Sequence, residues 1–400
     1  MSKKNDDFFA VKKDWSLVKD ELLGCYFKPY VAKILHTHKP LIYVDCFAGK
    51  GKFDDGNPGS PLIALEAITE CKNNTTISDV TIEATFIDLN YAEDLAKNLR
   101  DYPWVQIVSG KYEDNIDNIL RSKHGCNVFL YIDPYGIKSL RCNQFDQYAK
   151  SHFNTIELLI NMNSFGFIRE ASRALGASFE DEELFSDLVE YEPSRMDASE
   201  KSIVELNEIA GGDYWQAIIE RMNSKEINGY TAETLFAEQY CARLKKNYKY
   251  VLNMPLRIKR GQRPKYRMIH ATNHPSGCLL MVDNICNRWQ AMQNIQTGGQ
   301  LMMFNETYDN QIIDSAEIRN DVVEFISGIK KLTGITEAQA MFFMEYGPIC
   351  KTGDVAKVLK ELEKDNLIEI VRQPAYTDKG RPTSFMTEDK VKKVSVRWRL

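Results

Sequence analysis

The sequence predicts an α/β protein whose open, mostly parallel sheet carries a helical insertion and is followed by a smaller domain of helices and strands. Four apolar runs of strand length each end in polar or turn residues, which is typical of buried parallel strands with a site along their carboxyl edge. The first of these runs leads into a loop with two closely spaced glycines. After the loop at residues 294–300 (NIQTGGQ) the pattern changes to short helical segments and a β-ribbon, which indicates a separate domain.

The first forty residues, 1–40, predict a helix that covers the sheet. Apolar side chains recur there at three- or four-residue spacing: Trp15, Val18, Leu22, Tyr26 and Tyr30. A helix that simply packs on the sheet is the main interpretation. The alternative is that Lys19, Tyr26 or His36 contacts a ligand, because a leading helix can lie beside the loop that follows the first strand.

Residues 41–61 (LIYVDCFAGKGKFDDGNPGSP) are the most informative stretch of the chain. Residues 41–44 predict a buried strand, Asp45 lies at its carboxyl end, and Gly49 and Gly51 open a turn before a helix. A dinucleotide site needs three glycines, and a phosphate-binding P-loop needs a basic residue that is missing here. The loop instead suits a cationic ligand without phosphate, such as S-adenosylmethionine, held near a carboxylate and over glycines that have no Cβ atom. An ordinary strand-turn-helix corner is the alternative.

The later strands add polar groups to the same edge of the sheet. Residues 81–87 end in Asp88, where a carboxylate would hydrogen-bond a pair of ribose hydroxyls. Residues 105–108 form a third strand, and residues 127–132 (NVFLYI) form a fourth. Because parallel strands end at one edge, we expect the groups that follow them to form a single site.

The segment after the fourth strand is the best candidate for chemistry. Methyl transfer to an exocyclic base amine needs acceptors for the amine protons and an aromatic face that holds the base. Asp133 and the carbonyl group of Pro134 are the expected acceptors, and Tyr135 is the expected stacking partner. The segment is similar to the D-P-P-Y motif of amino-methyltransferases, although the second proline is missing and the tyrosine comes one place early. The alternative is that Asp133 caps a helix and Pro134 ends a strand. Asn161 and Asn163 are further candidates to face this cleft.

Together these motifs resemble the three-Cys-motif partner family. The matching segments are W-x3-K-x6-YF-x2-Y from Trp15, DCFAGKG at 45–51, DGNPGSPLIALEA at 55–67, FIDLN at 86–90, IDPYG at 132–136, GGDYW at 211–215 and YRMIHATNHPSGCLLM at 266–281. The resemblance implies a Rossmann-like class I methyltransferase domain and a partner, a radical-SAM-like protein that carries three cysteines. DCFAGKG replaces the more usual DGFAGPG, which puts Cys46 and Lys50 beside the expected ligand.

The expected site follows from these motifs. The residues expected to bind the cofactor S-adenosylmethionine are Asp45, Phe47, Gly49, Gly51 and Asp88. The residues expected to act in catalysis are Asp133, Pro134 and Tyr135.

Residues 164–244 predict a helical insertion, so the methyltransferase-like domain is expected to comprise residues 41–163 and 245–295. Within it, residues 245–268 hold nine Lys or Arg side chains and no Asp or Glu. Basic side chains that alternate with aromatic ones could follow a phosphate backbone while the rings stack on bases. The candidates for this role are Arg257, Lys259, Arg260, Arg263 and Lys265. The alternative is a sheet edge whose charges prevent pairing with other strands.

Residues 320–400 predict a winged-helix domain, because three helices precede a strand, a turn and a second strand. The last of these helices would be the recognition helix if the domain binds DNA, and Lys379 and Arg381 in the wing would reach phosphates. Glu361 and Glu363 on that helix oppose nucleic-acid binding, so docking of a protein is the alternative.

Composition sets the remaining limits. The chain has 400 residues, 44% hydrophobic content and a net charge of -5, which suits two or three domains but not a protein that coats nucleic acid with its whole surface. Neither a run of about 20 apolar residues nor a secretory signal is present, so we expect no membrane association and a cytoplasmic location. Nine cysteines without C-x2-C pairs predict buried thiols and no metal site.

The sequence therefore predicts an S-adenosylmethionine-dependent methyltransferase that acts on a nucleic-acid base, with an exocyclic amine as the favoured target. Its expected partners are the three-cysteine radical-SAM-like protein and DNA or RNA. The alternative is a non-catalytic scaffold that retains the fold and binds nucleic acid.

Overall fold

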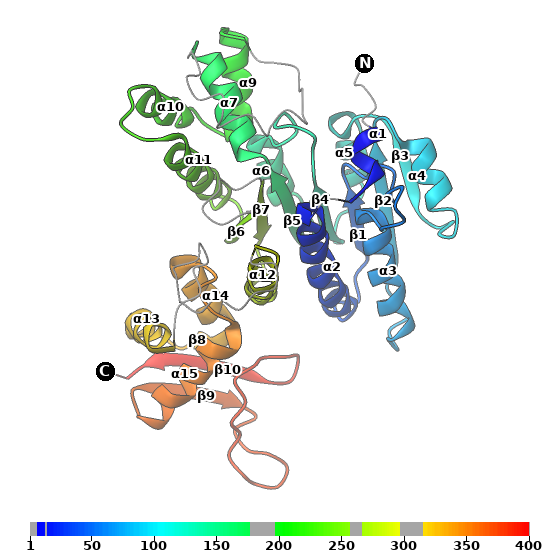
Figure 1. The fold of residues 1–400 in the computed structure, drawn as a ribbon. Coiled ribbons are helices and arrows are strands. Elements are labelled where there is room, and N and C mark those ends of the chain that lie inside the picture. Colours follow the sequence, from blue (N-terminus) through cyan, green and yellow to red (C-terminus); the bar gives the residue numbers. More distant parts are fainter. Residues whose placement is uncertain (1–5, 13, 177–196, 257–265, 297–314, 400) are drawn as a thin grey trace. The chain divides into compact units, whose positions relative to one another are not determined.

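The computed structural model describes residues 6–12, 14–176, 197–256, 266–296 and 315–399 (Figure 1). The chain separates into two compact units, Met1–Asn273 and His274–Leu400. The first unit holds a sheet of seven strands, and the second holds a sheet of three.

The seven strands of the first unit lie in the order β3-β2-β1-β4-β5-β7-β6. They span Leu41–Asp45 (β1), Ile82–Asp88 (β2), Gln106–Ser109 (β3), Asn127–Ile132 (β4), Thr155–Met162 (β5), Tyr250–Leu256 (β6) and Tyr266–Thr272 (β7). Strands β1 to β5 are parallel, whereas β7 is antiparallel to both β5 and β6. The predicted mixed α/β sheet is confirmed, and its order is consistent with a Rossmann-like methyltransferase fold.

The described helices of the first unit alternate with the strands and then form the insertion. They are Asp6–Ala10 (α1), Asp14–Leu35 (α2), Ser60–Asn73 (α3), Ala92–Asn98 (α4), Tyr112–Leu120 (α5), Cys142–Lys150 (α6), Ser164–Ala174 (α7), Glu200–Ala210 (α9), Trp215–Asn223 (α10) and Gly229–Leu244 (α11). Each of the first parallel strands is thus followed by a helix, as in βαβ units.

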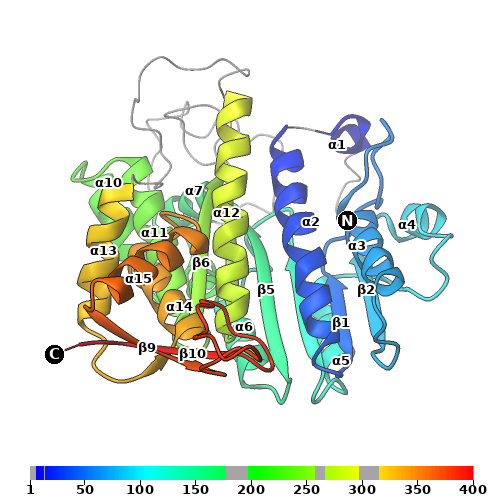
Figure 2. The same ribbon diagram turned by 90° about the horizontal axis from the view of Figure 1, so that it is seen from below.

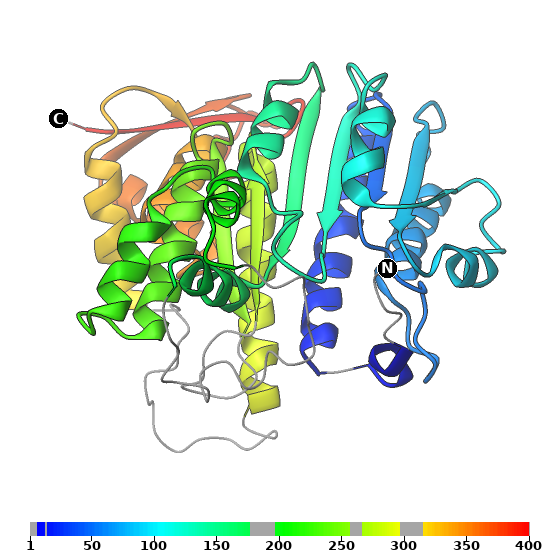
Figure 3. The same cartoon turned by 90° about the horizontal axis from the view of Figure 1, so that it is seen from above.

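The two faces of the sheet bury different side chains, because successive residues of a strand point to opposite faces. On one face, the rings of Tyr43 and Phe129 pack against Phe27 and Tyr30 of α2, with centroids 4.7 Å apart for Phe27 and Tyr43 and 5.1 Å apart for Tyr30 and Phe129. Helix α3 lies beside α2 on this face (Figure 2). On the other face, aliphatic residues of the same strands pack with α5, α6 and the insertion helices (Figure 3). The central strands are therefore buried on both faces.

The insertion helices α7, α9, α10 and α11 share an aromatic core. The rings of Phe167 and Phe236 stack with centroids 3.9 Å apart, which joins α7 to α11. Trp215 is fully buried, and its indole N–H donates to Asn207 at 2.8 Å, which joins α10 to α9. These helices fall within the predicted insertion at residues 164–244.

A buried carboxylate ties α2 to the antiparallel end of the sheet. Glu157 of β5 accepts hydrogen bonds from the hydroxyl group of Tyr26 and, at 3.2 Å, from that of Thr272. The Nε2 atom of His270 lies 3.1 Å from the same carboxylate. Since only 4% of the Glu157 side chain is exposed, these partners replace water as its hydrogen-bond donors.

The second unit combines helices with a small antiparallel sheet. Its elements are Pro275–Gln296 (α12), Ser315–Ser327 (α13), Thr333–Gly334 (β8), Ile335–Tyr346 (α14), Thr352–Lys364 (α15), Ile368–Gln373 (β9) and Lys393–Trp398 (β10), with the strand order β8-β10-β9. Helix α12 groups with this unit, whereas the sequence placed it in the methyltransferase-like domain up to residue 295. The winged-helix interpretation of residues 320–400 stays a prediction.

Among the described residues, no helix has both the length and the apolar character that crossing a membrane requires. The cytoplasmic location stays a prediction.

We expect Tyr26→Phe to lower the free energy of unfolding by about 1.5–3 kcal/mol, because it removes a hydrogen bond to a buried charged group. Chemical denaturation measures this loss. Tyr43→Phe is the matched control, since the Tyr43 hydroxyl is buried with no hydrogen-bond partner in the described structure, and its removal should cost almost nothing. Equal losses in the two variants would contradict the role given to Glu157.

Candidate functional site

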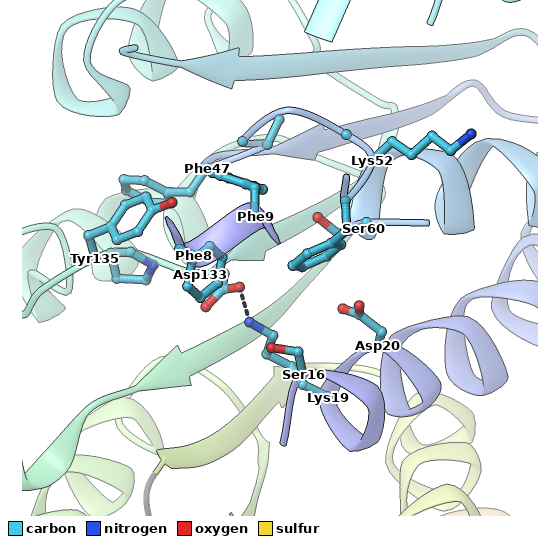
Figure 4. A pocket seen from close by; sticks show the side chains of 16 residues that line it. Phe8, Phe9, Ser16, Lys19, Asp20, Phe47, Lys52, Ser60, Asp133 and Tyr135 are labelled. Carbon is cyan, nitrogen blue, oxygen red and sulfur yellow. Dashed lines mark hydrogen bonds and ion pairs between the residues drawn. The ribbon is translucent and has the colours of Figure 1, made fainter. Parts of the chain in front are cut away.

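A pocket lies where the carboxyl ends of β1 and β4 meet, at the point where the strand order of the sheet reverses (Figure 4). Its lining comes from α1, α2, the loop after β1, the start of α3 and the segment after β4. The predicted residues Phe47, Gly49 and Gly51 line it together with Asp133, Pro134 and Tyr135. Open α/β sheets bind ligands at such a reversal point. Asp45 and Asp88 are not among the lining residues.

Two glycines shape the loop after β1. Gly49 and Gly51 have φ values of +60° and +75°, which residues with a Cβ atom rarely adopt. A Cβ atom at Gly51 would lie 2.8 Å from a methyl carbon of Leu95, and one at Gly49 would lie 2.9 Å from the ring of Phe9. The loop therefore needs glycine at both positions for its conformation and for its close contacts.

Asp45 lies directly behind the pocket and is fully buried. Its carboxylate accepts hydrogen bonds from the Ser60 hydroxyl at 2.7 Å and from the backbone N–H of Phe47 at 3.2 Å. Burial raises the pKa of Asp45 from 3.8 to about 7, although these two hydrogen bonds act in the opposite direction. Since Ser60 lines the pocket, it links the buried carboxylate to the ligand space. Sequence reasoning missed Ser60, although this residue lies in the matched segment DGNPGSPLIALEA at 55–67.

Asp88 holds the glycine loop in place through hydrogen bonds to its backbone. Its carboxylate accepts hydrogen bonds from the backbone N–H groups of Gly49, Asn90 and Tyr91, at 2.8, 2.8 and 2.7 Å. The structure thus gives Asp88 a role in fixing the loop. Its expected contact with a ribose stays a prediction.

Asp133 has a partner on each carboxylate oxygen. Lys19 of α2 donates to Oδ2 (Figure 4), and Asn161 of β5 donates to Oδ1 at 2.6 Å. The Asp133 side chain is 21% exposed and faces the pocket, so both oxygens are fixed in place while the carboxylate still reaches the ligand space. Asn161 was among the candidates from the sequence, and Lys19 was expected only as an alternative.

Helix α1 supplies two aromatic rings that sequence reasoning missed. Phe8 lies edge-on to Tyr135 with centroids 6.0 Å apart, and Phe9 lies edge-on to Tyr91 at 4.9 Å. Both phenylalanines line the pocket, with Phe53 completing the aromatic cluster. A helix of five residues has no detectable periodicity, so only the adjacent aromatic pair in the sequence was available as a signal.

Lys12, which follows α1, connects that helix to α2 and to the loop after β1. Its ammonium group lies 2.7 Å from the carboxylate of Asp20 and donates to the carbonyl oxygen of Pro58 at 2.7 Å. Its backbone N–H donates to Asp55 at 2.9 Å. Burial raises the pKa of Asp20, and the nearby charges of Lys19 and Lys12 oppose that shift. The rim is therefore held by charges from α2 and from the loop after β1.

The predicted nucleic-acid contacts fall into two sets. Arg257, Lys259, Arg260, Arg263 and Lys265 lie outside the described residues. Lys379 and Arg381 are exposed in the loop between β9 and β10 of the second unit. Among the described residues, no group of three or more His, Cys, Asp or Glu side chains is placed to hold a metal ion.

Comparisons with known proteins add little to this description. No family model matches the chain, and no curated protein sequence does. Solved structures with some similarity include the methyltransferase yhhF from Escherichia coli, at 16% identity and a TM-score of 0.24, covering 38% of this chain and 72% of that one. A geranyl diphosphate methyltransferase in complex with GPP and sinefungin has 10% identity and a TM-score of 0.25, covering 61% and 76%. The geranyl diphosphate C-methyltransferase from Streptomyces coelicolor A3(2) has 12% identity and a TM-score of 0.24, covering 62% and 76%.

These identities and TM-scores are too low to assign a family or a function to the chain. The interpretation of the site rests on the strand order and the residues of this chain. Membership of the three-Cys-motif partner family stays a prediction.

We expect Asp45→Asn to change how stability depends on pH. Between about pH 4 and pH 7 the folded protein keeps Asp45 protonated, whereas the unfolded chain ionises it at the ordinary pKa of 3.8. Its contribution to stability is therefore largest at low pH and falls as the pH rises through this window, by at most about 1.4 kcal/mol for each pH unit.

Urea denaturation at pH 5 and pH 8 measures this effect. The asparagine variant should lose less stability than the wild type on going from pH 5 to pH 8. Asp54→Asn changes an aspartate of the same loop whose side chain is 59% exposed, so it serves as the control. Identical pH dependence in Asp45→Asn and the wild type would overturn the assignment of a buried, largely protonated Asp45.

Proposed function

We propose that the first unit is an S-adenosylmethionine-dependent methyltransferase. The observation that carries this proposal is a single pocket that joins the glycine loop after β1 to the Asp133-Pro134-Tyr135 segment after β4. The first of these segments suits a cationic cofactor, and the second suits an amine that receives a methyl group. Bound cofactor would supply an electrophilic methyl group on a sulfonium ion.

Residues of this chain account for recognition of such a cofactor. Aromatic rings at Phe8, Phe9 and Phe47 line the pocket, and aromatic faces attract cations. Asp20 contributes a carboxylate to the same lining, and Asp45 lies behind it through Ser60. Apolar rings combined with carboxylates favour a sulfonium ligand over a phosphate-bearing one.

Asp133 is proposed to orient the amine that is methylated. Its ion pair with Lys19 and its hydrogen bond from Asn161 fix the carboxylate, and each oxygen keeps a lone pair that can accept a proton of the amine. Tyr135 beside it is 38% exposed, so its ring offers a surface on which a flat base can stack.

The finer parts of the proposal rest on the sequence. Within it, the acceptor is a base of DNA or RNA, and a radical-SAM-like protein with three cysteines acts as partner. The residues from 320 onward form a winged helix, a proposal supported by their observed order α13, β8, α14, α15, β9, β10. Lys379 and Arg381 are the proposed phosphate contacts of its wing.

A non-catalytic scaffold with the same fold is the second candidate. Two observations favour it: the ring of Phe9 packs against Gly49, and both oxygens of Asp133 already have protein partners. In that case the pocket serves the fold, and the chain contributes binding surfaces to a complex.

Calorimetric titration with S-adenosylmethionine tests the cofactor site. We expect wild-type protein to bind and Gly49→Ala to lose at least tenfold in affinity, because the added methyl group would enter the loop at the pocket. Gly56→Ala is the matched control, since Gly56 also has a positive φ, of +89°, but does not line the pocket. Equal affinity in the wild type and both variants would place the ligand elsewhere.

Transfer of a labelled methyl group to DNA and RNA oligonucleotides tests the chemistry. Asp133→Asn should retain cofactor binding within a few-fold but lower the rate of transfer at least a hundredfold, because general acid-base groups contribute about that much. Asp54→Asn should leave the rate unchanged. Wild-type rates in the Asp133 variant would remove Asp133 from the mechanism, and no transfer by the wild type in the presence of its partner would favour the scaffold.

A further inference from the structure

Helix α15 of the second unit exposes a face made of lysines. Its core side is formed by the buried residues Val355, Val358, Leu359 and Leu362. Lys357, Lys360 and Lys364 are exposed, and their three- and four-residue spacing places them on one face. At 100° per residue that face is directly opposite the core side. The solvent face of α15 therefore carries one positive charge on each helical turn.

The acidic residues of α15 do not neutralise these lysines, because each has another partner. Asp354 accepts a hydrogen bond at 3.2 Å from the backbone N–H of the residue before the helix. Glu361 pairs with Arg319 of α13 at 3.1 Å. Glu363 receives two hydrogen bonds from the guanidinium group of Arg372 of β9, at 2.6 and 2.7 Å.

The three lysines have no such partners. In the part of the chain that the structure describes, none of Lys357, Lys360 and Lys364 forms an ion pair or lies over an aromatic ring. Glu361 and Glu363 flank the lysine face on its two sides, and arginines hold both of them. The face is thus a row of uncompensated cations on a rigid helix.

We propose that this lysine face binds the phosphate backbone of duplex DNA without regard to base sequence. A row of positive charges complements a polyanion, and an α-helix fits the major groove of B-form DNA, which is about 12 Å wide. The major groove of A-form RNA is too deep and narrow for a helix to enter. The exposed face holds lysines but no Asn, Gln or Arg, so it lacks most of the side chains that pair bidentately with base edges. Because lysine binds phosphate as a flexible point charge, we assign its contacts to the phosphates.

This inference is independent of methyl transfer, since it concerns the second unit and requires no cofactor. It changes the interpretation of Glu361 and Glu363, which on the sequence alone were expected to oppose nucleic-acid binding. Both carboxylates are paired with arginines at the sides of the lysine face: Glu363 with Arg372, and Glu361 with Arg319, which also pairs with Asp365.

Fluorescence anisotropy of a labelled 24-base-pair DNA duplex tests the proposal, with full-length protein at several NaCl concentrations. The variant K357Q/K360Q/K364Q keeps good helix formers on an exposed face, so its thermal unfolding should match the wild type. Each lost phosphate contact lowers the slope of log affinity against log salt by about 0.9, so the triple variant should lose about 3 from the slope. The control K330Q/K331Q neutralises exposed lysines between α13 and β8 and should keep the wild-type slope.

The binding experiments support or overturn the proposal as follows. A scrambled duplex that binds within twofold of the first supports contact with phosphates alone. Wild-type affinity and slope in the triple variant would overturn the proposal, as would the absence of DNA binding by the wild type. Equal binding of an RNA duplex by the wild type would overturn the major-groove geometry. If the triple variant loses binding to anionic phospholipid vesicles but keeps binding to DNA, the lysine face binds a membrane and the proposal is overturned. None of these results depends on whether the first unit transfers methyl groups.

Discussion

The parallel pairing of β1 with β4 is the constraint on which the site depends. In this register Asp45 lies beside Tyr131, and the backbone N–H of Cys46 donates to the Tyr131 carbonyl oxygen at 2.9 Å. Both strands therefore end at the same level, and the chain continues into the glycine loop on one side and to Asp133 on the other. Two segments separated by some eighty residues of sequence thereby line one pocket. A shift of either strand by one residue would turn its side chains to the opposite face and dismantle the site.

The carboxylates around the pocket are compensated in two different ways. Asp133 has a lysine as its partner, and Asp20 has Lys12, whereas Asp45 has only neutral donors. This difference explains why burial leaves the pKa of Asp45 at about 7. A cation that enters the pocket would favour the ionised form of Asp45, so under the proposed function ligand binding and proton release are linked.

The sequence predicted the elements that have a strong local signal. The apolar runs ending at Asp45 and Asp88 became parallel strands, because a buried strand needs only a short apolar segment bounded by turn residues. The ion pair between Lys19 and Asp133 could not be predicted, since it joins positions 114 residues apart and depends on where α2 packs. Phe8 and Phe9 were missed for the same reason, because their helix is too short to show a period and its position is set by tertiary contacts.

The number of acidic and basic residues in a helix does not by itself predict the charge of its exposed face, because that charge depends on how the residues are paired. The sequence of α15 shows as many acidic as basic residues, which suggests a neutral face. Folding separates the two sets, because positions that point sideways meet Arg319 and Arg372 from neighbouring elements while positions that point outward meet only solvent. Bidentate pairing of Arg372 with Glu363 fixes that carboxylate at the side of the helix, and the geometry of such pairs is specific. A unit with almost balanced charge can therefore present a face of one sign.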